Sequence, residues 1–394
     1  MAKVLEGIRV LDFGRYIAGP FCAALLADFG AEVIRVDRVG GSEDRFVMPV
    51  TESGEGAFFL QSNRNKRSIT LDIDHPQGRE VVKRLIRDAD VVIANMPPAT
   101  LANLGLDYES LCAIKPDIIL TASSAFGSHA DAANRVGFDG VGQAMSGAVY
   151  MSGTPESPAK AMVPVVDFAT ALSCALGTVM ALYERRTSGK GQVVEASLLQ
   201  TALMFASGAL IEEAVLSIDR QATGNRSPIH GPSDIFRTRD GWIIVQVIGQ
   251  PLFRRWVRMI GDSALMDDPR FTDDLRRGEN GAALSEMMSA WCASRTREEA
   301  LAALEAARIP AGPVYSPREA LDDPAIQASH AFDWVDYPGL ARKAPIVVSP
   351  AMLSRTPPSI ESRPPTIGEH TTEILHEAGY GDAQIQALRE LGVA

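Results

Sequence analysis

VLDFGRYIAGPFCAALLADFGAEVIRVD, residues 10–37, is the stretch that decides the fold. The apolar run at 8–13 predicts a short buried strand, and residues 14–20 predict a turn. An apolar helix is predicted over 21–29 and a second strand over 32–36. The chain therefore opens with a β-α-β unit.

The same alternation continues through the first half of the chain. Further strands are predicted at 68–71, 91–95 and 118–122, with helical patterns between them at 78–88 and 108–114. Strands that alternate with helices favour a mostly parallel sheet covered by helices. The expected fold class is therefore α/β.

The length of 394 residues, 46% of them hydrophobic, favours two domains or one large domain with an insertion. We expect the first part of a large domain at 1–197, a helical linker at 198–223, a smaller α+β domain at 224–325 and a return to the large domain at 326–394. The loop-like sequence GNRSPIHGPSD starts at Gly224, where the composition changes.

The composition argues against several classes of partner. A net charge of −11 would repel nucleic acid. The four cysteines lack CxxC spacing and the six histidines form no HxH or HExxH pair, so we expect no metal site and a reducing, cytoplasmic location. We also find no signal peptide and no run near the roughly 20 apolar residues that span a bilayer, and expect no membrane partner.

A dinucleotide-binding fold is the first alternative for such an opening, because Asp37 ends the second strand. The turn reads GRYIAGP, with Gly14, Gly19 and then Pro20. The GxGxxG pattern that lets a backbone approach a pyrophosphate is missing. Nicotinamide binding is therefore not favoured.

Asp167 is the single charge between residues 161 and 183. Removing an ionised carboxylate from water costs several kcal/mol unless hydrogen bonds or a cation compensate. The residues alone leave three interpretations open: a helix N-cap, a paired charge or a working nucleophile.

The block at 10–37 resembles the opening of family III coenzyme A transferases, the CaiB/BaiF family, which also contains the α-methylacyl-CoA racemases. Other segments resemble that family's markers in the family's order: NRNKRSITLD at 63–72, VVIANMPP at 91–98, GFDGVGQAMSG at 137–147, RRTSGKGQVVEASL at 185–198, IPAGPV at 309–314 and IGEHT at 367–371.

The resemblance implies a Rossmann-like large domain made from both chain ends, a smaller inserted domain and a homodimer of interlocked rings. It also implies a CoA-transferase in which Asp167 attacks an acyl-CoA thioester and passes through a mixed anhydride and an aspartyl-CoA thioester. Coenzyme A is then a substrate, and no cofactor is bound permanently. The acceptor is a small carboxylic acid.

Five residues are candidates for holding coenzyme A, because an acidic protein needs placed cations and amides for its phosphates. They are Arg38, Lys66, Arg67, Asn95 and Arg135. Arg38 follows the second strand, and Asn95 resembles a coenzyme contact of the family.

Four of these candidates have a plainer interpretation. Arg38 is then a solvated loop charge, Lys66 and Arg67 pair with surface acids such as Asp72, and Asn95 makes a turn. Arg135 is expected to compensate for an arginine of the family that is replaced here by Asn103.

Transfer is favoured over racemisation by Phe138, which stands where the racemases have a histidine base. The position that resembles their second acid falls near Gln250. Ile17 and Phe138 also replace a glutamine and a tyrosine of the formyl-CoA transferases, which makes an oxalate pocket doubtful.

Six residues are candidates for contact with the acyl group or the acceptor: Tyr16, Ile17, Phe138, Gln143, His230 and Gly249. Gly249 lies in a loop that could hold an oxyanion. Plainer roles stay open: a core aromatic for Tyr16, a helix hydrogen bond for Gln143 and an exposed loop for His230. The alternatives to a transferase are a racemase or epimerase and a non-catalytic acyl-CoA-binding protein.

Overall fold

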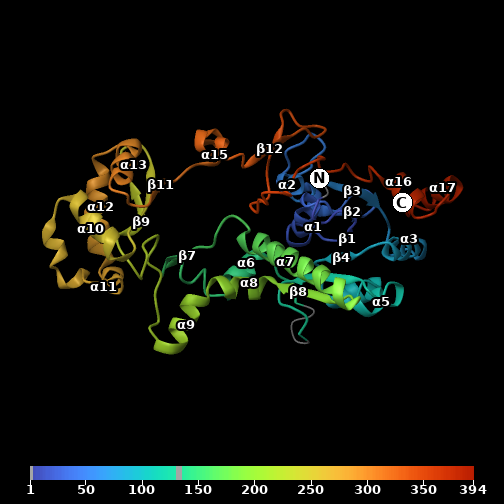
Figure 1. Ribbon diagram of the computed structural model, residues 1–394, viewed down its shortest axis with the longest axis horizontal. Coiled ribbons are helices and arrows are strands. Elements are labelled where there is room, and N and C mark those ends of the chain that lie inside the picture. Colours follow the sequence, from blue (N-terminus) through green and yellow to red (C-terminus); the bar gives the residue numbers. More distant parts are fainter. Residues whose placement is uncertain (1–2, 130–134) are drawn as a thin grey trace. The chain divides into compact units, whose positions relative to one another are not determined.

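The computed structural model describes residues 3–129 and 135–394, and the chain divides into two compact units (Figure 1). The first unit contains residues up to 146, together with 161–208 and 328–394. The second unit contains 147–160 and 209–327. These bounds differ from the expected domains: 147–160 joins the second unit, and the expected linker is divided between the first unit (198–208) and the second (209–223). The return to the first unit begins at 328 rather than at 326.

A six-stranded parallel sheet is the centre of the first unit, with the strand order β3-β2-β1-β4-β5-β8. The strands are β1 Arg9–Asp12, β2 Glu32–Asp37, β3 Lys66–Thr70, β4 Val91–Ala94, β5 Ile119–Ser124 and β8 Val193–Ser197. The predicted α/β class with a mostly parallel sheet is therefore confirmed.

Helices cover both faces of this sheet because neighbouring strand residues point to opposite sides. Val10 and Val33 pack with α1 (Ala18–Asp28) and α7 (Val165–Ser188) on one face. Leu11 and Ile34 belong to the core on the other face, whose helices are α3 Pro76–Arg87, α5 Tyr108–Ile114, α16 Thr371–Glu377 and α17 Asp382–Glu390.

Helix α1 begins at Ala18, three residues earlier than the predicted 21–29. Pro20 does not prevent this start, because the first turn of a helix does not use its N–H groups for intrahelical bonds. The turn that follows β1 is shorter as a result, and Tyr16 and Ile17 lie next to the helix start.

Helix α7 is long and apolar enough to cross a membrane by length and composition. The expectation that no stretch has this composition is therefore wrong. One such helix is weak evidence for a membrane, because the core helix of a folded domain has the same composition. Here α7 packs against α1 and the sheet.

The remaining elements of the first unit are short. They are a 3-10 helix at Glu43–Phe46, α2 Ala57–Ser62, α4 Pro98–Leu104, α6 Asp139–Met145, α8 Leu198–Phe205, and the antiparallel pair β12 Phe332–Val335 and β13 Ala344–Val347. Helix α9 (Ser207–Leu216) begins at its boundary with the second unit. The C-terminal tail returns to β3, where His370 Nδ1 accepts a hydrogen bond from Ser68 N.

The second unit combines an antiparallel sheet of order β11-β10-β9 with helices, and its core includes Trp256 and Phe253. Its strands are β6 Gly153–Thr154, β7 Ser157–Pro158, β9 Ser233–Arg237, β10 Trp242–Gln246 and β11 Ala311–Pro313. Its α-helices are α10 Gly249–Ile260, α11 Asp274–Glu279, α12 Gly281–Ala293, α13 Arg297–Ala306, α14 Pro317–Asp322 and α15 Pro324–Ala328, which ends at the boundary. Two 3-10 helices lie at Ser263–Met266 and Pro269–Phe271.

Candidate active site

A cavity of about 650 Å³ lies at the carboxyl edge of the parallel sheet in the first unit. Residues at the ends of strands line it: Arg38, Asn95 and Leu198 directly follow β2, β4 and β8, and Arg15 lies three residues after the end of β1. In open α/β sheets this edge is where ligands bind. Asp167 lines the same cavity.

Asn95 fixes the turn between β1 and α1. Its Oδ1 accepts a hydrogen bond from Arg15 N at 2.6 Å, and its Nδ2 donates one to Arg15 O at 2.7 Å. The turn needs this support because Tyr16 has a φ of 61°, which costs a non-glycine residue free energy. Asn95 thus lines the cavity, but its amide is engaged in making the turn.

Asp167 is the third residue of α7, and Pro164 is the residue at the N-cap. The N-cap interpretation of Asp167 is therefore wrong. Within the described residues, no N–H or hydroxyl donates to its carboxylate and no cation pairs with it. The side chain is half-buried and lines the cavity, where no described residue compensates its charge.

The pKa of Asp167 is raised to about 7, mainly by burial and secondly by the negative charge of Asp139. Loss of hydration disfavours the ionised form, and a neighbouring carboxylate does the same. Perturbed groups of this kind in a cleft are candidates for chemistry.

Asp139 is the residue that sequence reasoning missed as a cap of α7. Its Oδ2 accepts hydrogen bonds from Val166 N at 2.7 Å and from Asp167 N at 3.0 Å. These N–H groups lie in the first turn, where a helix supplies no acceptor. The sequence separation from α7 hid this role, although Asp139 and Gln143 are spaced as neighbours on one helix face.

Two of the predicted cations reach the cavity. Arg38 has a side chain that is 69% exposed, and its ion pair with Glu43 is 3.5 Å long. The guanidinium of Arg135 lies over the ring of Phe126, 4.1 Å from its centroid. Arg15 also lines the cavity, while its Nη1 donates to the carbonyls of Phe13, Gly14 and Val36.

Lys66 and Arg67 do not line the cavity, which does not fit their predicted contact with coenzyme A. Lys66 is buried, and its Nζ donates to Asp12 Oδ2 at 2.7 Å and to the Pro20 carbonyl. Arg67 pairs with three glutamates, Glu32, Glu373 and Glu377. Neither pairs with Asp72, but Arg67 does pair with surface acids, as the plainer interpretation expects, whereas the partner of Lys66 is buried.

Tyr16, Ile17 and Phe138 all line the cavity. The rings of Tyr16 and Phe138 meet edge to face, with centroids 5.5 Å apart. Phe138 is 63% exposed, so its ring is available to a ligand. This part of the cavity is therefore apolar, as the substitutions at 17 and 138 predict.

Three other predicted contacts have partners of their own. Gln143 is buried outside the cavity lining and bonds to Asp139, as the plainer interpretation expects. His230 Nδ1 lies 2.7 Å from Ser233 Oγ. Gly249 N donates to the carboxylate of Asp274 at 2.9 Å, so this N–H is engaged rather than open to an oxyanion. His230 and Gly249 both belong to the second unit.

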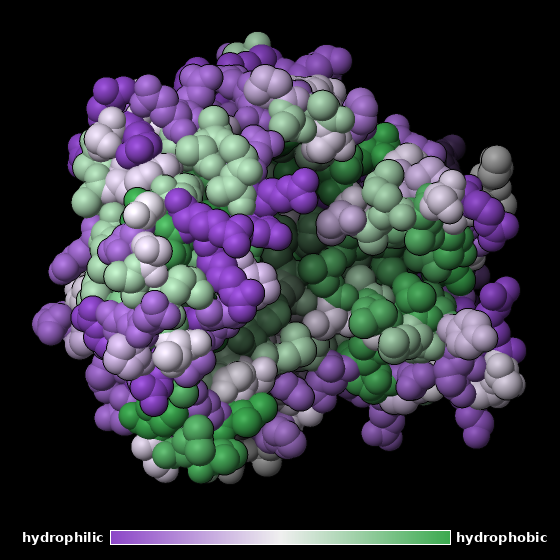
Figure 2. Space-filling model, turned by 60° about the vertical axis from the view of Figure 1, so that its left-hand side comes forward, coloured by the Kyte–Doolittle hydropathy of each residue, from purple (hydrophilic) through white to green (hydrophobic). Residues whose placement is uncertain are grey.

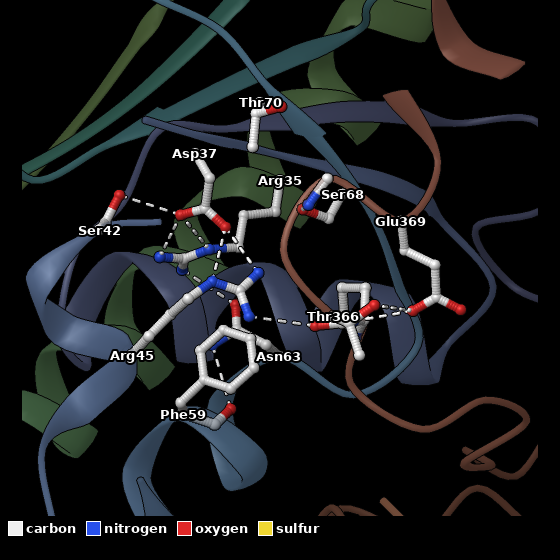
Figure 3. Close-up of polar contacts among 12 residues, drawn as sticks. Arg35, Asp37, Ser42, Arg45, Phe59, Asn63, Ser68, Thr70, Thr366 and Glu369 are labelled. Atoms are coloured by element: carbon white, nitrogen blue, oxygen red, sulfur yellow. Dashed lines mark hydrogen bonds and ion pairs between the residues drawn. The ribbon is translucent and has the colours of Figure 1, made fainter. Parts of the chain in front are cut away.

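A buried ionic cluster surrounds Asp37, the last residue of β2 (Figure 3). Asp37 accepts hydrogen bonds from Arg35 Nε at 3.0 Å and from Arg45 Nη2 at 2.6 Å. Ser42 Oγ donates to the same carboxylate at 2.9 Å. Asp37 therefore anchors the end of β2 instead of binding a ligand.

The sequence matches CoA-transferase family III over residues 5–371. It is 34% identical to a succinyl-CoA–D-citramalate CoA-transferase of Chloroflexus aurantiacus, over 95% of this chain and 93% of that protein. A succinate–glutarate CoA-transferase of Agrobacterium fabrum is 33% identical, with 95% of each chain covered.

Solved structures agree with these matches. A CaiB/BaiF family protein from Brucella suis superposes with a TM-score of 0.83 and 31% identity, over 96% of this chain and 100% of that one. The family match, the relatives and the shared fold all extend over nearly the whole length, with the cavity at the edge of the sheet. The chain belongs to CoA-transferase family III.

Proposed function

We propose that this protein transfers coenzyme A from an acyl-CoA donor to a carboxylic acid, with Asp167 as the nucleophile. The observation that carries the proposal is the carboxylate of Asp167, which lines the cavity without a hydrogen-bond donor or cation among the described residues. A carboxylate without a hydration shell is a stronger nucleophile, and dry surroundings protect an anhydride from hydrolysis.

The reaction is a series of acyl exchanges. An oxygen of Asp167 attacks the thioester carbonyl, the C–S bond breaks, and a mixed anhydride and coenzyme A thiolate form. The thiolate then attacks the carbonyl of Asp167, which releases the donor acid and leaves an aspartyl-CoA thioester. The acceptor carboxylate attacks that carbonyl, the thiolate leaves again, and it takes the acceptor acyl group from the second anhydride, which frees Asp167.

Arg38 and Arg135 are the cations that we propose for the phosphates of coenzyme A, since both line the cavity. Succinyl-CoA is the donor to test first, because two relatives are named for reactions with succinyl-CoA or succinate. The apolar surface of Ile17 and Phe138 argues for an acyl chain longer than a formyl group.

We further propose a homodimer, supported by apolar residues on the surface of the first unit. Helix α7 exposes Leu176 (58%), Met180 (61%) and Tyr183 (74%), and α8 exposes Phe205 (58%). Figure 2 shows hydrophobic side chains gathered in patches between hydrophilic ones. Large exposed apolar patches mark interaction surfaces. Light scattering on the purified protein tests this: a monomer at all concentrations contradicts it.

The decisive experiment traps the enzyme-bound intermediate. The protein is incubated with succinyl-CoA and then with hydroxylamine, and the modified peptide is mapped by mass spectrometry. We expect a hydroxamate at Asp167 and none at Asp74, a carboxylate of the same cavity. Asp167→Asn should remove the label, whereas Thr170→Val in the same helix, outside the cavity lining, should keep it.

Other outcomes select the alternatives. Binding of coenzyme A esters without any label, across a panel of acyl groups, supports a non-catalytic binding protein. Exchange of the acyl α-proton with deuterated solvent, without transfer of coenzyme A, supports a racemase. Asp139 is a poor second base for a racemase, because its carboxylate is engaged by the backbone of α7.

A further inference from the structure

The chain leaves the first unit after α6 and returns to it just before Asp167. Residues 147–160 belong to the second unit, and Ala161 starts the return. The returning segment is exposed, with Met162 at 91% and Val163 at 62%. The exposed segment has little packing of its own to fix the position at which α7 begins, so other contacts must fix it.

Asp139 and Gln143 on α6 hold both ends of the returning segment. Gln143 Oε1 accepts a hydrogen bond from Ala161 N at 2.8 Å. Asp139 Oδ2 accepts from Val166 N and Asp167 N. Between them, Gln143 Nε2 donates to Asp139 Oδ1, and both side chains are buried.

The polarity of this chain of hydrogen bonds is fixed. Backbone N–H groups can only donate, so the outer atom of each side chain must be an acceptor. Gln143 then presents its NH₂ group inward, and the atom of residue 139 that meets it must be an acceptor as well. A carboxylate at 139 together with an amide at 143 satisfies every bond of this pattern. Two amides or two carboxylates leave at least one bond unmade.

We propose that Asp139 and Gln143 form a clamp of positioning residues, which fixes the first turn of α7 and thereby holds the Asp167 carboxylate in the cavity. This inference rests on the proposed role of Asp167 as nucleophile. The clamp also places a negative charge beside Asp167, and that charge contributes to the raised pKa of Asp167.

Few other titratable groups lie on the elements packed against α7. Helix α1 carries Cys22 and Asp28, and β8 carries Glu195, whereas β5 and α8 carry none. Asp28 pairs with Arg64 and Glu195 bonds to Ser128. On α7 itself the others are Cys174, Tyr183, Glu184, Arg185 and Arg186, and the turn before α1 adds Arg15 and Tyr16. Among these, Asp139 is the charge that acts on Asp167.

An exchange of the two side-chain types tests the clamp. Asp139→Asn and Gln143→Glu should each lower kcat about 10-fold to 100-fold, with KM for the acyl-CoA nearly unchanged, because each breaks one bond of the fixed pattern. The double variant Asp139→Asn/Gln143→Glu restores the pattern, with the carboxylate now at 143. Its kcat should return to within about threefold of wild type.

The pH profile separates positioning from simple stability. In the double variant the negative charge lies farther from Asp167, so the acid limb of kcat/KM should move to lower pH by about half a unit or more. A double variant as slow as the single ones, or an unshifted acid limb, overturns the clamp. Thr170→Val, which breaks the buried hydrogen bond from Thr170 in α7 to Thr201 in α8, is the control for mere destabilisation.

Failure of the underlying function has a different signature. If wild type transfers coenzyme A but Asp167→Asn does so equally well, the nucleophile is wrong whatever the clamp variants do. If Asp167 is labelled in wild type and the single clamp variants retain full kcat, the clamp alone is wrong.

Discussion

Asp37 and Asp167 are two aspartates withdrawn from water in the same unit, with opposite electrostatic surroundings. Asp37 lies between Arg35 and Arg45, which hold its pKa well below the usual range despite its burial. Asp167 has no cation partner among the described residues, and its pKa is raised to about 7. Burial by itself thus does not decide the role of a carboxylate; its partners do.

This difference in partners decides whether the carboxylate oxygens are available to a substrate. The oxygens of Asp37 are occupied by guanidinium and hydroxyl groups, so they are not available to a substrate. Among the residues that the structure describes, the oxygens of Asp167 have no such partners, and Asp167 lines the cavity. A stable charge holds β2 in place, while a poorly stabilised one is ready to react.

Asp167→Asn should have the largest effect. Without the nucleophile, transfer from succinyl-CoA to an acceptor acid should fall by about 10⁴-fold or more, measured by chromatography of the CoA esters. Binding of coenzyme A should persist, because the cations of the cavity are unchanged. If the variant retains a tenth of the wild-type activity, Asp167 is not the nucleophile and its contrast with Asp37 is not one of catalytic role.

Asp37→Asn should lower the free energy of unfolding by about 3–5 kcal/mol, because Arg35 and Arg45 lose a buried counter-charge. Urea denaturation measures this change. Because the pKa of Asp37 is lower in the folded protein than in the unfolded chain, ionised Asp37 stabilises the fold at any pH above the unfolded pKa. This stabilisation is lost as the pH falls toward the pKa of the folded state. The matched control is Asp336→Asn, which removes an exposed pair with Lys343 and should cost at most about 1 kcal/mol.

The pH dependence of catalysis should follow the raised pKa of Asp167. The proposed nucleophile is the ionised carboxylate, so kcat/KM should rise with pH and level off above about 7. Below that, the rate should fall about tenfold per pH unit. An acid limb near the ordinary aspartate value would show that water reaches Asp167.

Arg38→Ala tests whether the exposed Arg38 binds a ligand, unlike the buried arginines near it, Arg35 and Arg45, which stabilise the fold. Arg38 follows Asp37 directly but lines the cavity, so KM for the acyl-CoA should rise about tenfold through loss of a charge-assisted contact. Stability should change by less than about 0.5 kcal/mol, because its pair with Glu43 is exposed. Unchanged KM would leave Arg38 as a solvated loop charge.

Asp167→Asn should also stabilise the fold. The folded state binds the proton of Asp167 more tightly than the unfolded chain, so ionisation costs stability as the pH rises from about 4 to about 7. Thermal unfolding at about pH 8 should therefore show a higher midpoint for the variant, and the gain should shrink toward about pH 4. If the unfolding midpoint of the variant is lower than that of wild type at both about pH 8 and about pH 4, the carboxylate of Asp167 has a stabilising partner and the interpretation is wrong.

The sequence by itself determined the parallel sheet, the opening β-α-β unit and the exceptional position of Asp167, because these depend on local hydrophobic patterns. Only the tertiary structure decided which charges are engaged. Lys66 meets Asp12, Arg67 meets Glu373 and Glu377, and Asp139 meets the first turn of α7. These partners lie from 28 to more than 300 residues apart, and no local pattern encodes such contacts.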